Sequence, residues 1–318
     1  MQHFLLSSQA RTISLKAVFT MGETKAYETF CQMRWPENDG EAVCPRCGCV
    51  ETYNITSRRK FKCVACHHQF SVTSGTIFAS RKMSFTDLLA AIVIFVNGAK
   101  GIAALQLSRD LDCQYKTAFV LTHKLREAMA RENMGATLGG VVEVDGAYFG
   151  GYVKPANEKV DRKDRRLLEN RTGKRKVVVV ARERSGRTLT FIGRSEAQGV
   201  PFIRSVVETG ATVHADEGSA WDALHANYDT GRVNHSFRYM DKGVCTNQAE
   251  SYFSRLRRME VGTHHHIAGP YLNAYAGEAS WREDNRRVAN GAQAGKVGVA
   301  AMEAPVSRQW KGYWQREA

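Results

Sequence analysis

Three acidic residues stand where carboxylates could hold a divalent metal ion. Asp145 and Asp216 each lie at or near the end of an apolar run typical of a strand, and Glu250 lies in a segment with helical spacing. Carboxylate oxygens are the hard, charged ligands that suit Mg²⁺ or Mn²⁺. Two strands and one helix that brought these side chains together would form a metal-dependent phosphoryl-transfer site.

The segment 246–258 predicts an amphipathic helix, with Thr246 as its N-cap. Its buried stripe would consist of four apolar residues: Ala249, Tyr252, Phe253 and Leu256. Asn247, Glu250 and Arg257 lie at positions i, i+3 and i+10 and share roughly one face. A carboxylate for a metal ion and a cation for a phosphate group would then lie on the same side of this helix.

Four of the eight cysteines have the spacing of a tetrahedral zinc site. They follow the pattern C-x₂-C-x₁₅-C-x₂-C: Cys44, Cys47, Cys63 and Cys66. Each pair brings two sulfurs to one side of a tight turn, and the segment between the pairs alternates like a short hairpin. The pattern predicts a zinc ribbon whose Zn²⁺ is structural, because no coordination position remains open for chemistry. Cys49 and His67 are the competing ligands.

A helix-turn-helix motif is predicted after the ribbon. Ser84 is suited to cap a first, apolar helix over residues 85–96. Two shorter amphipathic segments follow, 101–111 and 114–125, with a break at Asp112. The second segment would direct polar side chains toward a DNA groove: Gln114, Tyr115, Lys116, Thr117, His123 and Lys124. A helical hairpin without a DNA-binding role is the alternative.

From residue 140 the apolar period changes to that of a sheet. Four strands are predicted, at residues 141–149, 176–183, 187–193 and 211–216, with a helix at 201–208 between the last two. Together with the helix that carries Glu250, this order matches an RNase H-like core, an α/β fold with a mixed sheet and flanking helices. The basic segment 154–176, between the first two strands, is expected to be an exposed loop.

The charge of the chain indicates a polyanionic partner. Lys and Arg number 45 against 32 Asp and Glu, which gives a formal net charge of +13. No apolar run approaches the length of roughly 18 residues that a membrane span requires, and the N-terminus lacks a signal-peptide pattern. A cytoplasmic location is expected, where cysteines are metal ligands or free thiols rather than disulfides.

Ten short motifs follow one another along residues 34–287. They are CPRCG at Cys44, SGTIF at Ser74, RKM at Arg81, ALQLSRDL at Ala104, YKTA at Tyr115, VEVDGAYFGG at Val142, ADE at Ala215, VNHS at Val233, TNQAE at Thr246 and GTHHH at Gly262. In this order they resemble the zinc-ribbon branch of bacterial insertion-sequence transposases, the ISXO2-like transposases. The resemblance implies that Asp145, Asp216 and Glu250 are the catalytic acids. It places Arg257 where the family has a lysine, and leaves Asn247 as a competing third ligand.

The resemblance implies a DNA transposase that binds terminal inverted repeats through its ribbon and helix-turn-helix. Its RNase H-like DDE domain would perform strand cleavage and 3′-hydroxyl strand transfer with Mg²⁺ or Mn²⁺. The expected partner is double-stranded DNA, both the repeats and the target, bound by a homo-oligomer at the bacterial nucleoid. Two alternatives stay open: a DNA-binding regulator with an inactive RNase H-like domain, and a stand-alone nuclease.

The expected organisation has five parts. They are a weakly ordered N-terminus at 1–25, the zinc ribbon at 26–80, the helix-turn-helix domain at 81–135, the DDE domain at 136–288 and a flexible C-terminal tail at 289–318.

Several reactive side chains are expected to have other roles. The histidines 264–266 are consecutive and cannot all face one ion in regular structure, so they are expected in a loop. His235 is expected to be a hydrogen-bonded structural residue. Tyr148 and Tyr252 are expected to pack or to contact DNA, because a carboxylate site needs no protein nucleophile.

Overall fold

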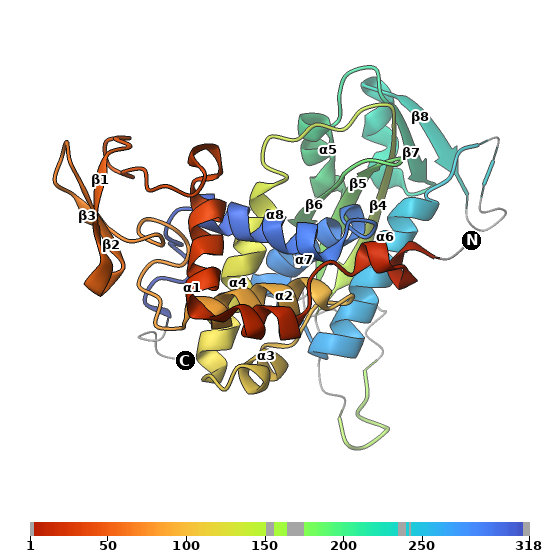
Figure 1. The fold of residues 1–318 in the computed structure, drawn as a ribbon. Helices are drawn as coiled ribbons and strands as arrows, with labels where there is room; N and C mark the ends of the chain where they lie inside the picture. Colours follow the sequence, from red (N-terminus) through yellow and green to blue (C-terminus); the bar gives the residue numbers. More distant parts are fainter. Residues whose placement is uncertain (1–2, 151–155, 164–174, 235–239, 242, 314–318) are drawn as a thin grey trace. The chain divides into compact units, whose positions relative to one another are not determined.

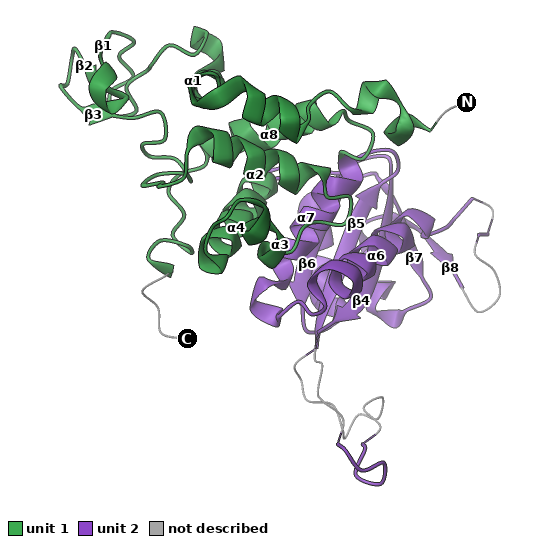
Figure 2. Ribbon diagram, turned by 60° about the horizontal axis from the view of Figure 1, so that its bottom comes forward, with its two compact units in different colours: residues 1–132, 285–318 green, residues 133–284 purple. Residues whose placement is uncertain are grey.

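The computed structural model describes residues 3–150, 156–163, 175–234, 240–241 and 243–313. Most of the predicted basic loop 154–176, and His235, lie outside these residues. The chain forms two compact units, drawn in different colours in Figure 2. The helical unit comprises residues 1–132 and 285–318, and the sheet unit comprises residues 133–284. In the part of the chain described, no helix is long and apolar enough to cross a membrane.

The sheet unit is built on five strands in the order β6-β5-β4-β7-β8 (Figure 1). Their bounds are β4 Val141–Phe149, β5 Lys176–Glu183, β6 Thr188–Gly193, β7 Thr212–Asp216 and β8 Asp229–Val233. The central strand β4 pairs antiparallel with β5 and parallel with β7, so the sheet is mixed. Four of the five strands lie where the sequence predicts them. The fifth, β8, was not predicted because an edge strand reading Asp-Thr-Gly-Arg-Val has little apolar signal.

Helices cover both faces of this sheet. Side chains alternate along each strand, so Val142 and Val144 face one side and Ala147 and Phe149 the other. The first side packs against helix α5, Val200–Val206. The second packs against helices α6, Asn247–Met259, and α7, Leu272–Asp284. The predicted α/β fold, a mixed sheet with flanking helices, is confirmed.

The helical unit combines a three-stranded ribbon with a bundle of helices. The ribbon strands are β1 Thr52–Ile55, β2 Lys60–Cys63 and β3 Gln69–Phe70, and the helices are α1 Leu15–Arg34, α2 Phe85–Asn97, α3 Ala104–Asp110, α4 Tyr115–Arg131 and α8 Asn290–Glu303. Ser84 caps α2 as predicted, because its hydroxyl oxygen accepts a hydrogen bond from the Asp87 N–H at 2.9 Å. Asp112 lies between α3 and α4 with φ of 45°, the left-handed conformation that a tight turn between helices requires.

Both ends of the chain differ from the sequence prediction. Helix α1 begins at Leu15, within the part expected to be weakly ordered, and is broken at Gly22, whose φ of 72° is left-handed. The expected flexible tail contains α8, tied to the N-terminal segment by Asn290, which bonds the N–H of Thr12 and the C=O of Ile13. Small residues explain the error. A segment rich in Gly and Ala was predicted to be flexible, but in α8 these small residues allow close packing. A Cβ at Gly298 would overlap the Met33 sulfur.

Candidate functional site

Strands β4 and β7 place the two aspartates side by side. In the parallel ladder between these strands Val144 lies opposite Ala215, and both belong to the core on the α5 side. The next residue of each strand, Asp145 and Asp216, therefore points to the opposite face of the sheet. This is the face that helix α6 covers.

Helix α6 carries the third predicted acid. The helix spans Asn247–Met259, and its buried stripe is the one expected: Ala249, Tyr252, Phe253 and Leu256. Asn247, Glu250 and Arg257 are exposed. Glu250 and Arg257 are seven residues apart, so they share one side of the helix about 10 Å apart along its axis.

The pKa of Asp145 is sensitive to three other acids. Burial raises the pKa of Asp145, and a hydrogen bond from the Gly146 N–H opposes the shift. The negative charges of Asp216, Glu250 and Glu196 raise the pKa further, to about 7. The charges of three acids from other elements therefore act on Asp145, and we call Asp145, Asp216, Glu250 and Glu196 the acidic cluster.

Glu196 is the member of this cluster that the sequence did not reveal. It opens a short 3₁₀ turn after β6 and approaches β4 from the α5 side of the sheet. A Cβ on Gly146 would point to that side, away from the face of Asp145, and would lie 2.5 Å from the Glu196 Cγ. Burial raises the pKa of Glu196, and the charge of Asp216 raises it further. A glycine directly after Asp145 is the one sequence signal that another group approaches this strand closely.

The acidic cluster is wider than the shell of a single ion. Among the described residues, the cysteine group alone has three or more ligand atoms that all lie within 4.8 Å of one another. The oxygens of Asp145, Asp216 and Glu250 thus converge without forming one compact set.

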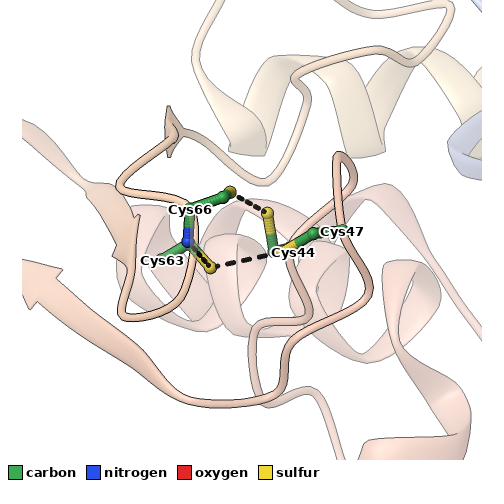
Figure 3. A group of neighbouring side chains, drawn as sticks. All are labelled: Cys44, Cys47, Cys63 and Cys66. Atoms are coloured by element: carbon green, nitrogen blue, oxygen red, sulfur yellow. Dashed lines mark hydrogen bonds between the residues drawn. The ribbon is translucent and has the colours of Figure 1, made fainter.

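The four predicted zinc ligands form a compact cluster at the end of the ribbon (Figure 3). The sulfurs of Cys44 and Cys66 are 3.6 Å apart, and those of Cys47 and Cys63 are 3.5 Å apart. Four thiolates at the usual distance from one Zn²⁺ would be about 3.8 Å apart, so the cluster fits a tetrahedral ion. A hydrogen bond from the Cys66 N–H to the Cys63 sulfur lowers the pKa of Cys63 to about 6, which favours the thiolate.

Two family models match the chain in the ranges that carry these two clusters. A model described as "ISXO2-like transposase domain" matches residues 137–284, and one described as "Transposase zinc-ribbon domain" matches residues 21–69. The chain belongs to the ISXO2-like transposases. The first match spans nearly all of the sheet unit of this transposase, and the second ends within the ribbon. A comparison with curated proteins found no match.

The predicted DNA-contacting residues of the transposase lie at the N-cap of helix α4 and within it, and they fall into an exposed group and a buried or partly buried group. Gln114, Tyr115, Lys116 and Thr117 are exposed at the beginning of α4. His123 is only 1% exposed, so its prediction as a groove-facing residue is wrong. Its ring stacks on Trp310, with ring centroids 4.4 Å apart, because the C-terminal segment packs against this side of α4. Lys124 is partly buried, and burial lowers its pKa.

Tyr252, Tyr148 and His264, for which no chemical role was predicted, each contact other protein groups. The Tyr252 hydroxyl is buried and donates to the Ala276 carbonyl at 3.0 Å. Tyr148 is exposed and lies under the Arg175 guanidinium. His264 packs edge-to-face against Tyr275 at the end of a π-helical turn that extends α6.

Proposed function

We propose that this transposase binds the ends of its element, cleaves the DNA there and joins the freed 3′-hydroxyl to target DNA. Asp145, Asp216 and Glu250 would be the metal ligands of an RNase H-like DDE site. The strand order and mixed pairing of the sheet support that fold, with two of the acids on adjacent parallel strands and the third on a helix over the same face.

The observation that carries the proposal is the placement of Asp145 and Asp216 side by side on two parallel strands, on the face that α6 covers. The raised pKa of Asp145 agrees with this placement. A partly buried carboxyl near three other carboxyls is electrostatically costly, because each additional negative charge opposes its ionisation. Such an arrangement is typical of functional sites rather than of structural ion pairs. Divalent cations would offset this repulsion, and carboxylates are the ligands that Mg²⁺ and Mn²⁺ prefer.

The width of the acidic cluster fits two ions better than one. Oxygens bound to a single Mg²⁺ lie within about 4.2 Å of one another, whereas two-metal sites hold their ions a further 3.5–4 Å or so apart. When bound, the ions would polarise the scissile phosphate and activate first a water molecule and then the 3′-hydroxyl. Asp145, Asp216 and Glu250 would hold the ions through their carboxylate oxygens. Asn247, exposed one turn before Glu250, is the alternative third ligand.

The remaining residues of the site would bind and orient DNA. Arg257 shares the exposed side of α6 with Glu250 and can hold a phosphate through two parallel hydrogen bonds. No tyrosine nucleophile is required, and the buried Tyr252 hydroxyl is already bonded to a carbonyl.

End recognition would belong to the helical unit. The exposed residues at the start of α4 have the position from which a recognition helix contacts base edges. The zinc ribbon and the net charge of +13 favour contacts to phosphates. Because two ends must be joined in one reaction, we expect a homo-oligomer on double-stranded DNA, acting at the nucleoid in the cytoplasm.

A cleavage and joining assay tests the proposal. The full chain is incubated with Mg²⁺ and labelled DNA carrying the repeats that flank its gene, with Asp145→Asn as the matched control. Nicking at the repeat ends followed by joined products supports a transposase. Binding without cleavage would instead identify a regulator, and cleavage without joining a stand-alone nuclease.

A further inference from the structure

We propose that Glu143 is a positioning residue: its carboxylate holds the first turn of helix α6 against strand β4, so that Glu250 faces Asp145. The inference rests on the proposed function, because the placement of Glu250 matters only if Glu250 is a metal ligand.

The Glu143 carboxylate lies at the N-terminus of α6 and binds two of its backbone amides. Its Oε2 accepts hydrogen bonds from the N–H of Gln248 at 2.7 Å and from the N–H of Ala249 at 3.2 Å. N–H groups of a first helical turn have no partner inside the helix, and a negative charge is favoured there. The Thr246 hydroxyl, expected to cap this helix, donates instead to the Glu250 Oε1 at 3.5 Å. The cap of α6 is therefore supplied by the sheet.

The other oxygen of Glu143 belongs to a buried polar network. Its Oε1 accepts from the Arg184 Nε at 2.9 Å. The Arg184 Nη2 also lies 3.1 Å from the His214 Nδ1 and donates to the Cys245 sulfur at 2.9 Å. The Cys245 N–H donates to the same ring nitrogen at 3.4 Å. The network joins β4, β7 and the residues that enter α6 through side chains that are mostly buried.

Glu143 connects the strand that carries Asp145 with the helical turn that carries Glu250. Glu143 and Asp145 are two residues apart on β4, so they point to the same face about 6.6 Å apart along the strand. Gln248 and Ala249, which Glu143 binds, directly precede Glu250 on α6. A shift of the first turn of α6 would therefore move Glu250 relative to Asp145 while leaving both side chains intact.

Stability alone does not account for a carboxylate at this position. Glu143 is 0% exposed, and its neighbours on the strand, Val142 and Val144, are apolar. Removing a carboxylate from water is costly even when it is paired, and an apolar residue of similar size often serves stability as well. What an apolar residue could not provide is a fixed anchor for two helix amides. We therefore assign to Glu143 the placement of Glu250.

The test measures Mn²⁺ affinity of the full chain by calorimetry for Glu143→Gln. This variant keeps the side-chain length but replaces one acceptor oxygen with a donor that faces donors. Loss of a residue that orients a ligand costs about 10–100-fold in metal affinity, so we expect Mn²⁺ to bind at least about 10-fold more weakly. Raising the Mn²⁺ concentration should then restore part of the cleavage rate. Hydrogen exchange should accelerate in the first turn of α6 but not in β4 or β5.

Two further variants keep the test decisive. Glu143→Asp retains the charge for Arg184 but withdraws the oxygens from the α6 amides, and it replaces Glu143→Gln if that variant does not fold. Glu278→Gln is the matched control, because Glu278 is equally buried in an ion pair with Arg282 on α7. It should lower the melting temperature without changing Mn²⁺ affinity.

The outcomes separate this inference from the proposed function. Unchanged Mn²⁺ affinity in both Glu143 variants, with affinity lost in Asp145→Asn, would overturn the positioning role and leave the metal site intact. Unchanged affinity in Asp145→Asn itself would overturn the metal site.

Discussion

The cysteine cluster and the acidic cluster of this transposase are assembled in opposite ways. The four cysteines come from residues 44–66, and their sulfurs already lie within 4.8 Å of one another. The acids come from β4, β7, α6 and the turn after β6, and they meet only because the sheet brings these elements together. A local site needs only its own turns, whereas a site built from remote elements needs anchors such as Glu143. Each cluster should therefore fail by its own route.

The largest effect is expected from Asp145→Asn or Asp216→Asn. If the two ions stabilise the transition state by several kcal/mol, the cleavage rate should fall by about 1000-fold or more. Binding of end DNA should stay within about twofold, because the basic surface is unchanged. Gel-based cleavage and binding assays measure the two quantities separately. Cleavage at the wild-type rate would reject the metal assignment.

Loss of a zinc ligand should have the complementary result. Cys63→Ser removes one thiolate, and since zinc binding drives folding of such ribbons, the ribbon should unfold and bind end DNA more weakly. Elemental analysis should show the loss of zinc, while the Mn²⁺ affinity of the sheet unit should not change. A full complement of zinc in this variant would contradict the ligand set.

A third prediction concerns the stability of the sheet unit against pH. Asp284 accepts hydrogen bonds from the N–H and hydroxyl of Thr188, yet burial raises its pKa to about 6. The folded state therefore binds this proton more tightly than the unfolded state, whose pKa is near 4. The stabilisation that protonated Asp284 gives the folded state is complete below about pH 4 and is lost as the pH rises through 6.

Asp284→Asn should remove this pH dependence. Relative to the variant, the wild-type free energy of unfolding should fall by about 2 kcal/mol between pH 4 and pH 7. Urea unfolding across this range measures the difference. A difference that does not change with pH would show that Asp284 titrates at its ordinary pKa.

The smallest effects should separate two residues of α4 that the sequence grouped together. Lys116 is exposed, so Lys116→Ala should weaken DNA binding modestly and reduce the slope of log K against log salt by about 1, without changing stability. His123 is buried against Trp310, so His123→Ala should lower stability and leave this slope unchanged. Salt titrations of DNA binding and thermal melts give the comparison. A reduced salt slope with unchanged stability in His123→Ala would show that His123 contacts DNA.

The sequence predicted the parts of the fold whose signal is local. Strands β4 and β5 read as apolar runs and lie at their predicted bounds, and the paired cysteines indicated their cluster by spacing alone. The cap at Ser84 and the break at Asp112 were also predicted, because each depends on a few neighbouring residues.

What the sequence did not predict depends on contacts between distant residues. Glu196 joins the acidic cluster through the path of the chain after β6, which no spacing rule records. Trp310 buries His123 from the other end of the chain, so helical periodicity alone misassigned that face of α4. Glu143 was read as part of a strand motif, and its contact with the α6 amides appears only once the sheet and helix are packed.

Anomalous scattering from crystals of the transposase grown with Mn²⁺ tests the central claim most directly. We predict Mn²⁺ peaks bounded by carboxylate oxygens of Asp145, Asp216 and Glu250. Ordered protein with no Mn²⁺ at these oxygens would contradict the account, and Mn²⁺ bound by Asn247 in place of Glu250 would contradict its third ligand.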